Sequence, residues 1–167
     1  MIDFRRAALP VFALLCVTAT PAAAAPAAVG KPAPGFTVTT MDKHQVKLAD
    51  LKGKVIVINH WATWCGPCKA EMPMMSAFHR RYKDSGFEIF GVTTDDSAPP
   101  SALKDLARVL SYPLARTFNG RGYPTLGGVP TTYVIDRKGV VRYARSGSFD
   151  AERFGEIVLP LLRESAE

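Results

Sequence analysis

The chain has 167 residues, of which 47% are hydrophobic and 22% are charged. This length suits one globular domain with a single core and leaves too little sequence for two substantial domains. The formal net charge is +6, which is compatible with acidic partners. However, the sequence contains no block of like charges and no interleaving of basic and aromatic residues, so the charge does not indicate nucleic-acid binding.

The first 24 residues have the layout of a secretory signal peptide. Arg5 and Arg6 precede a short apolar segment, and the small residues Ala22 and Ala24 follow it in the spacing of a cleavage site. We therefore expect residues 1–24 to direct export to the periplasm. If they are not cleaved, they would keep the protein anchored at the membrane.

Cleavage after Ala24 would remove Cys16 and leave Cys65 and Cys68 as the only cysteines. It would also leave 19 basic and 14 acidic side chains (21 − 2 and 15 − 1), a net charge of +5. Disulfides persist in exported compartments. The spacing of the two cysteines alone does not distinguish a structural disulfide, half of a metal site and a redox pair.

The first predicted elements are strands. Residues 25–35 are rich in proline and indicate a flexible lead-in, so we place the folded domain at residues 36–167. The segments FTVTT (36–40) and QVKL (45–48) predict a hairpin. The unbroken Val/Ile run of KVIVINHW (54–61) predicts a strand buried on both faces, as in a sheet with helices on each side.

After this strand the pattern changes to a helix. Pro67 suits a first helical turn, and an apolar helical series follows it, so Cys65 and Cys68 lie where the strand turns into the helix. FEIFGV (87–92) predicts a second buried strand, and SALKDLARVL (101–110) predicts a second amphipathic helix.

The last elements are a hairpin and a helix. VPTTYVID (129–136) and VVRYARS (140–146) flank the turn signal RKG. Asp150 can cap a final helix that carries Phe154 and Leu161 on one face. The alternation of strands and helices predicts an α/β fold.

The position of the cysteines favours thiol chemistry. A thiolate is the attacking species, and a free cysteine is mostly protonated at neutral pH. The free N–H groups and the dipole at a helix N-terminus stabilise the anion. We therefore predict that Cys65 attacks and that Cys68 resolves the mixed disulfide formed at Cys65.

The motifs WCGPCK (64–69) and VPTT (129–132) resemble those of the thioredoxin superfamily, and more closely its exported branch of ResA, TlpA and CcmG-like thiol-disulfide oxidoreductases. The resemblance extends from Gly30 to Leu162. It implies a thioredoxin-like fold, in which a central mixed sheet carries helices on both faces. It also implies an extra N-terminal hairpin and a central insertion within residues 93–124.

The same resemblance implies further site residues. Pro130 matches the cis-proline that faces the disulfide, which would leave the backbone around Val129 free to pair with an extended substrate. Trp64 would offer an apolar contact beside the cysteines. Gly66 and Pro67 complete the predicted substrate-binding group.

Proton handling is expected to differ from that of cytosolic thioredoxin. Asn59 takes the place of a buried aspartate there and cannot accept a proton at neutral pH. Glu71 matches the acidic residue of the ResA-like branch and lies close to one helical turn after Cys68, so we predict that it accepts the proton. The alternative is a solvated glutamate favoured by the helix dipole. His60, where the family usually has an aromatic residue, is either a core histidine or a redox residue.

The expected activity is that of a periplasmic thiol-disulfide oxidoreductase that reduces exported proteins, with apocytochrome c as a target implied by the resemblance. We expect a monomer that needs no cofactor, binds no nucleic acid and receives electrons from a membrane donor of the DsbD or CcdA type. The dipeptide Gly66-Pro67 is that of thioredoxin, and the resemblance implies a reductant because the histidine that more oxidising relatives place beside the second cysteine is missing here. A potential near that of thioredoxin, about −270 mV, follows.

The alternatives are a disulfide oxidase or isomerase, a thiol peroxidase and a non-enzymatic metal carrier. A peroxidase would need a peroxidatic threonine-to-cysteine motif, which is missing. Zinc needs about four ligands, and in addition to the two cysteines the sequence offers the histidines His44, His60 and His79. We therefore predict no metal site.

Overall fold

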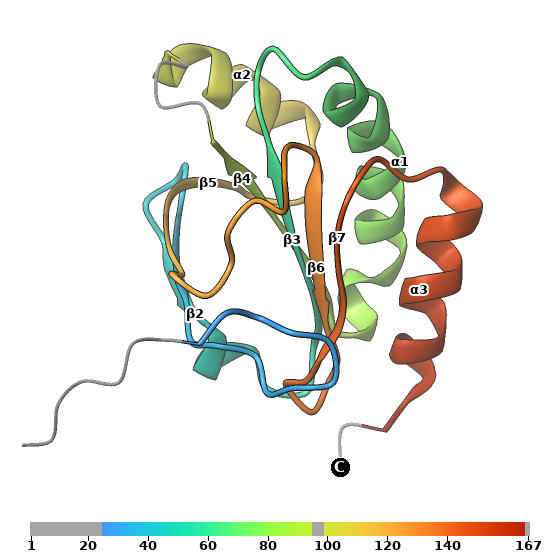
Figure 1. The fold of residues 1–167 in the computed structure, drawn as a ribbon. Helices are drawn as coiled ribbons and strands as arrows, with labels where there is room; N and C mark the ends of the chain where they lie inside the picture. The colour runs from blue at the N-terminus through green and yellow to red at the C-terminus, as the bar shows by residue number, and fades with distance from the viewer. Residues whose placement is uncertain (1–24, 95–98, 166–167) are drawn as a thin grey trace, which may run out of the picture.

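The structure is a computed structural model that describes residues 25–94 and 99–165 (Figure 1). The predicted signal peptide, residues 1–24, lies outside this range. Seven strands form one sheet in the order β2-β1-β5-β4-β3-β6-β7. Among the described residues, no helix has the length and apolar character needed to cross a membrane.

The elements alternate along the chain as the sequence predicts. Strand β3 pairs in parallel with β4 and antiparallel with β6, so the sheet is mixed. This confirms the thioredoxin-like α/β fold. In chain order the elements are β1 (Thr37–Thr40), β2 (Gln45–Lys47), η1 (Leu48–Leu51, a 3-10 helix), β3 (Val55–Trp61), α1 (Gly66–Tyr82), η2 (Lys83–Ser85, 3-10), β4 (Phe87–Thr93), α2 (Pro100–Val109), β5 (Leu114–Asn119), β6 (Thr131–Ile135), β7 (Val141–Ser146) and α3 (Ala151–Arg163).

Strand β3 is the centre of the molecule, and all seven of its residues are buried. Because side chains alternate between the faces of a strand, β3 supplies two separate cores. Val57 and Trp61 join the apolar cluster on one face, whereas Ile56 and Ile58 join the cluster on the other. The polar residues near the end of β3 therefore also point to opposite faces.

The two faces are covered unequally. Helices α1, α2 and α3 all contribute to the first cluster, through Met72, Leu103 and Phe154 respectively. The connections β3–α1–β4 and β4–α2–β5 step across the sheet in the same direction, and right-handed crossovers then place both helices on one face. The sequence analysis expected helices on both faces. Among the described residues, the second face is covered by the 3-10 helix η1, with Leu51, and by irregular segments such as the one around Tyr123.

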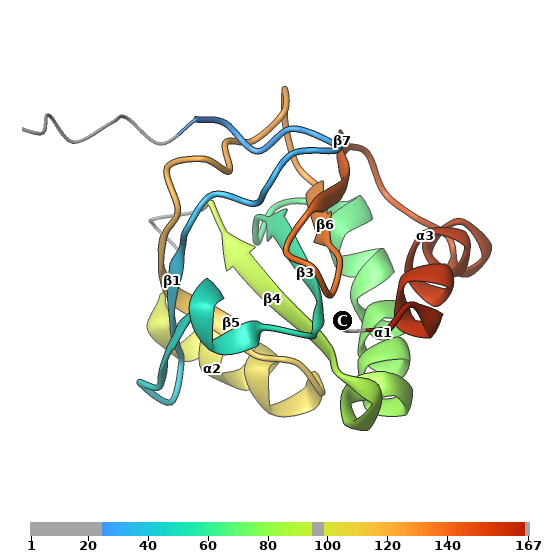
Figure 2. The same cartoon turned by 90° about the horizontal axis from the view of Figure 1, so that it is seen from below.

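One of these irregular segments is the lead-in, residues 25–35, which we expected to be flexible. It has almost no regular structure, but backbone hydrogen bonds hold it on the domain, for example from the Gly30 N–H to the Val141 carbonyl at 2.8 Å. The Tyr123 hydroxyl also donates to the Pro34 carbonyl at 2.6 Å. Figure 2 shows the lead-in in blue on the side of the sheet away from α1 and α3. Composition alone could not predict these contacts, and the flexibility expected of the lead-in stays a prediction.

Strand β5 lies within the predicted insertion, residues 93–124, and the sequence analysis missed it. It pairs in parallel with β4, with Gly91 opposite Leu114, and antiparallel with β1, with Val38 opposite Phe118. The N-terminal hairpin β1–β2 is thus joined to the sheet through β5. The strand begins buried and ends exposed, so it shows neither an apolar run nor a clean alternation.

The second hairpin and the last helix agree with the sequence. Strands β6 and β7 pair antiparallel. The Asp150 carboxylate caps α3 by accepting a hydrogen bond from the Arg153 backbone N–H at 2.8 Å. Phe154 and Leu161 are buried on the face of α3 that packs against the sheet.

Candidate active site

The two cysteines lie at the junction of β3 and α1 and form a disulfide with each other. Cys65 is the N-cap residue of α1, and its sulfur accepts a hydrogen bond from the Cys68 backbone N–H at 3.2 Å. Pro67 occupies the first turn, where a missing N–H costs nothing. The free N–H groups at this helix end therefore point toward the Cys65 sulfur, as predicted.

The residues around the disulfide differ sharply in exposure. Trp64 is 72% exposed, and Gly66 and Pro67 are also exposed. Cys68 is fully buried, whereas Cys65 retains 4% exposure. An incoming sulfur can therefore reach Cys65 first. Trp61, the other tryptophan of the WATWCGPC segment, is 1% exposed and belongs to the core.

The loop before β6 covers the disulfide from the other side. The Val129–Pro130 peptide bond is cis, as the resemblance implies. The Val129 carbonyl oxygen lies 3.8 Å from the Cys65 sulfur. A disulfide sulfur carries no proton, so in this state the approach is a contact and not a hydrogen bond. Thr131 fixes the loop by donating from its hydroxyl to the Gly128 carbonyl at 2.6 Å.

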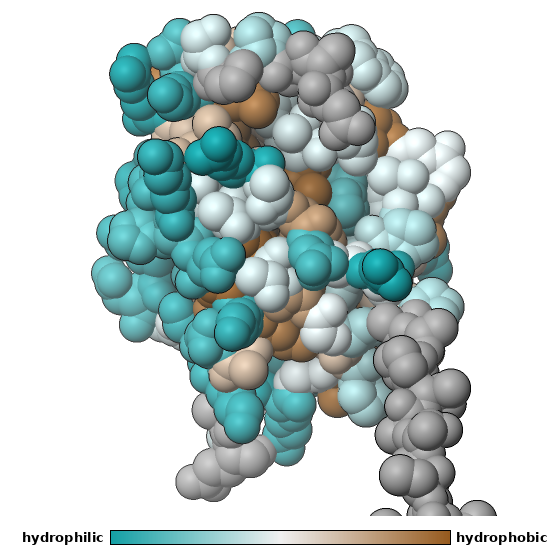
Figure 3. All heavy atoms as spheres, turned by 90° about the vertical axis from the view of Figure 1, so that its left-hand side faces the viewer, coloured by the Kyte–Doolittle hydropathy of each residue, from teal (hydrophilic) through white to brown (hydrophobic). Residues whose placement is uncertain are grey.

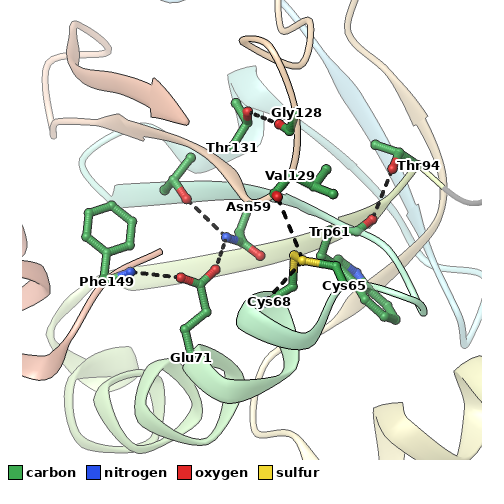
Figure 4. The surroundings of a disulfide bond; sticks show 11 residues. Asn59, Trp61, Cys65, Cys68, Glu71, Thr94, Gly128, Val129, Thr131 and Phe149 are labelled. Atoms are coloured by element: carbon green, nitrogen blue, oxygen red, sulfur yellow. Dashed lines mark hydrogen bonds between the residues drawn. A yellow bond between two sulfur atoms is a disulfide. The ribbon is translucent and has the colours of Figure 1, made fainter. Parts of the chain in front are cut away.

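Beside the disulfide, Glu71 joins three elements (Figure 4). One carboxylate oxygen accepts a hydrogen bond from the Asn59 side-chain amide at 2.9 Å. The other accepts one from the Phe149 backbone N–H at 3.0 Å. The Asn59 amide also donates to the Thr132 hydroxyl at 3.0 Å. These contacts connect α1 to β3, β6 and the segment before α3.

The environment of Glu71 changes its acid-base behaviour. The side chain is 3% exposed, so the alternative of a solvated glutamate is wrong. Burial raises the pKa of Glu71 above its ordinary value, because an ionised carboxylate loses its hydration; the hydrogen bonds from Phe149 and Asn59 oppose this rise. A carboxyl with a raised pKa exchanges protons closer to neutral pH than an exposed glutamate does.

His60 follows Asn59 on β3 and points to the opposite face. It is 5% exposed and packs edge-on against the rings of Phe118 and Tyr133. Neither ring nitrogen has a hydrogen-bond partner among the described residues. Burial lowers the pKa of His60 to about 4, and a weak interaction with the Tyr123 backbone offsets only part of this effect. His60 is therefore a neutral buried histidine, and it does not belong to the network of Glu71.

Sequence reasoning missed two members of the site. Phe149 acts through its backbone N–H from a segment between β7 and α3, and no side-chain pattern marks that role. Thr132 lies in the VPTT motif, but its contact with Asn59 depends on the pairing of β3 with β6. Within residues 25–94 and 99–165, no three His, Cys, Asp or Glu side chains are grouped as metal ligands.

Comparison with known proteins agrees with this geometry. The profile of the AhpC/TSA family matches residues 29–144. Over 140 residues the chain is 34% identical to thiol-disulfide oxidoreductase ResA of Geobacillus kaustophilus, an alignment that covers 80% of this chain and 79% of that protein. ResA of Bacillus thuringiensis is 35% identical over 132 residues, covering 77% and 75% of the two chains. The crystal structure of a thiol:disulfide interchange protein from Chlorobium tepidum superposes with a TM-score of 0.69 at 30% identity, covering 84% of this chain and 99% of that one.

Proposed function

Since this chain belongs to the AhpC/TSA family and is a thiol-disulfide oxidoreductase, we propose that it works in the periplasm as a reductase of disulfides in exported proteins. The observation that supports the chemistry is the Cys65–Cys68 disulfide at the N-terminus of α1, below the Val129 carbonyl. The reducing direction is inferred from the dipeptide Gly66-Pro67 and from the absence of a histidine beside Cys68.

In the reductase cycle, the Cys65 thiolate of the reduced protein attacks one sulfur of the substrate disulfide. A bond forms between Cys65 and that sulfur, and the other substrate sulfur leaves as a thiolate. Cys68 then loses its proton and attacks the Cys65 sulfur, which releases the second substrate thiolate. Two electrons have passed to the substrate, and the protein ends with the disulfide that the structure shows.

We assign the proton of Cys68 to Glu71. Both residues lie on α1 and are buried, and the raised pKa of Glu71 suits a group that takes up a proton near neutral pH. Asn59 and the Phe149 N–H hold the carboxylate in place before and after this transfer. The two oxygens of Glu71 need not move, because one donor is the Phe149 backbone N–H and the other is the Asn59 side chain on β3.

The substrate segment is proposed to lie between the exposed Trp64 and the Val129 backbone. Trp64 supplies a large apolar surface, and a free backbone edge beside Pro130 can pair with an extended chain. Export by residues 1–24, electron supply from a membrane donor of the DsbD or CcdA type and apocytochrome c as a substrate remain parts of the proposal that rest on the sequence.

The redox potential of the Cys65–Cys68 pair tests the direction. We expect a value near that of thioredoxin, about −270 mV, when the protein is equilibrated against a thioredoxin standard. A value above about −180 mV, in the range of isomerases and oxidants, would overturn the reductase and favour disulfide donation or isomerisation. Peroxide consumption by the reduced protein would instead support the thiol peroxidase.

A further inference from the structure

A pocket of about 870 Å³ lies at the edge of the sheet where β3 and β4 end. Its walls come from parts of the chain that are far apart in sequence: the β1–β2 turn, the ends of β3 and β4, helix α2, strand β5 and the loop before β6. Figure 3 shows the face of the molecule that carries β1, β2 and β5, with hydrophobic surface between hydrophilic side chains. The reductase chemistry proposed above uses none of the residues that line this pocket.

The lining of the pocket is basic. Lys43 comes from the β1–β2 turn, Lys104 from α2 and Arg116 from β5. No described carboxylate lines the pocket, and none of the three cations forms an ion pair with a described residue. Asp95 and Asp96 follow Thr94 in the sequence and lie outside the described residues. A ligand with negative charge fits the described lining best.

A buried polar group without a partner also lines the pocket. His60 is 5% exposed, and both of its ring nitrogens lack a hydrogen-bond partner among the described residues. A buried unpaired polar group is costly, and each one in a native structure calls for an explanation. Both nitrogens are themselves buried, so a ligand would reach the imidazole only if the side chains that cover it move aside.

Two residues of the pocket wall link it to the two segments that hold the disulfide. Thr94, in its wall, donates from its backbone N–H to the Trp61 carbonyl at 2.8 Å, three residues before Trp64. Thr125, also in the wall, lies on the loop that leads to Val129 and Pro130. The pocket and the proposed substrate path across Val129 therefore share the loop before β6.

From these observations we propose that the pocket binds an acidic segment of the protein whose disulfide is exchanged at Cys65. This inference rests on the proposed function and deepens it, because it names the charge of the substrate. The net charge of +6 acts in the same direction over longer distances. Lys43, Lys104 and Arg116 would attract the segment, and His60 is part of the wall against which it would lie.

Exchange with charged peptides tests the proposal. Short peptides carry one cysteine as a mixed disulfide with mercaptoethanol and, beside it, a run of either glutamate or lysine. At low ionic strength we expect the wild-type reduced protein to reduce the glutamate peptide about tenfold faster than the lysine peptide. The double variant Lys104→Glu/Arg116→Glu should lose or reverse this preference.

The matched control is Lys52→Glu/Lys138→Glu. Both lysines are exposed and lie in turns at the other end of the strands from the pocket. This double change alters the net charge by the same amount as Lys104→Glu/Arg116→Glu. This control should keep the preference for the glutamate peptide. Equal losses in the two double variants, or no preference in the wild type, would overturn the pocket as the recognition site.

A small neutral substrate separates this inference from the proposed function. Hydroxyethyl disulfide has no charge, so all variants should reduce it at the wild-type rate. If the wild type fails to reduce it, the reductase function itself fails. If it is reduced normally but the peptides show no dependence on charge, only the inference about the pocket fails.

Binding can also be measured without chemistry. For this measurement the cysteine of the glutamate peptide is replaced by serine, so that no disulfide exchange can occur. The imidazole signals of the protein are then followed by NMR as the peptide is added. We expect the signals of His60 to shift on addition of the peptide, while those of His79, which is held by Ser111 and Glu88, stay unchanged. An unchanged His60 at saturating peptide would overturn the proposal.

Discussion

Asn59 and His60 are neighbours on β3, and both are buried, yet their surroundings differ completely. The Asn59 amide donates two hydrogen bonds on the face of α1, to Glu71 and Thr132. The His60 ring, on the other face, has no partner among the described residues. A pleated strand makes this separation unavoidable, because adjacent side chains point to opposite sides of the sheet.

The difference distinguishes two uses of a buried polar residue. On the face of α1, the polar groups are connected to one another, which fixes a carboxyl beside the disulfide without any ligand. On the other face, the structure leaves His60 unpaired next to a basic pocket. We interpret the first as internal chemistry and the second as part of the wall of a binding pocket.

Glu71→Gln tests the first half of the comparison and should have the largest effect. The variant keeps the shape of the side chain but cannot accept a proton, so exchange should slow by about 10²- to 10³-fold, equivalent to about 3–4 kcal/mol on the barrier. The measurement is the rate of disulfide exchange against pH, with circular dichroism to verify the fold. Exchange at the wild-type rate across neutral pH would show that the proton acceptor is another group.

The fold of this variant should survive for a specific reason. A glutamine at position 71 has one acceptor and one donor group, whereas Asn59 and Phe149 now both donate to the carboxylate. Rotation of the Asn59 amide by half a turn would offer its carbonyl oxygen, which has no partner among the described residues, to the new donor. The Thr132 hydroxyl can then donate instead of accept.

The sequence predicted best those features that depend on neighbouring residues. The strand β3, the start of α1 at Cys65 and the cap at Asp150 are encoded by neighbouring residues, and the structure places them where the sequence predicts. Glu71 was identified by resemblance and by its spacing from Cys68. Its burial was not predicted, because it depends on Phe149, far along the chain.

The features that were missed are those that depend on distant contacts. Strand β5 is defined by its position between β1 and β4, and its own sequence has no strand pattern. The contacts of the lead-in were missed because its partners lie far along the chain; the Val141 carbonyl, for example, is 141 − 30 = 111 positions after Gly30. The pocket beside His60 combines six separate segments, so only the fold could assemble it.

His60→Phe tests the second half of the comparison, with a somewhat smaller effect. Burial lowers the pKa of His60 to about 4 in the folded protein, whereas the ordinary value is 6.5. The unfolded state therefore binds the proton more readily than the folded state. The wild type should therefore lose roughly 3 kcal/mol of stability as the pH falls from above 6.5 to about 4, and the variant should be spared this loss. Above pH 7 the variant should gain about 1 kcal/mol by removing an unpaired polar group.

Denaturant unfolding at several pH values measures this difference. His44→Phe is the control, because the His44 side chain is exposed beside Asp42 on the β1–β2 turn and its removal leaves the buried imidazole of His60 in place. If the wild type loses no more stability than His60→Phe as the pH falls to about 4, the imidazole of His60 is solvated. The variant should also bind the glutamate peptide more weakly, which connects its stability to the pocket.

Asn59→Ala has the smallest expected effect and sharpens the comparison, because it removes a connection on the face of α1 without removing the carboxyl. Loss of the amide takes away one hydrogen bond that favours ionised Glu71, so the pKa of Glu71 should rise further. The Glu71-dependent midpoint of the exchange rate against pH should then move to higher pH, with about 1 kcal/mol lost in stability. Thr132→Val is the matched control, since it removes the other acceptor of the Asn59 amide and leaves the Asn59–Glu71 hydrogen bond. If both variants move the midpoint equally, Asn59 acts through packing and not through its hydrogen bond to Glu71.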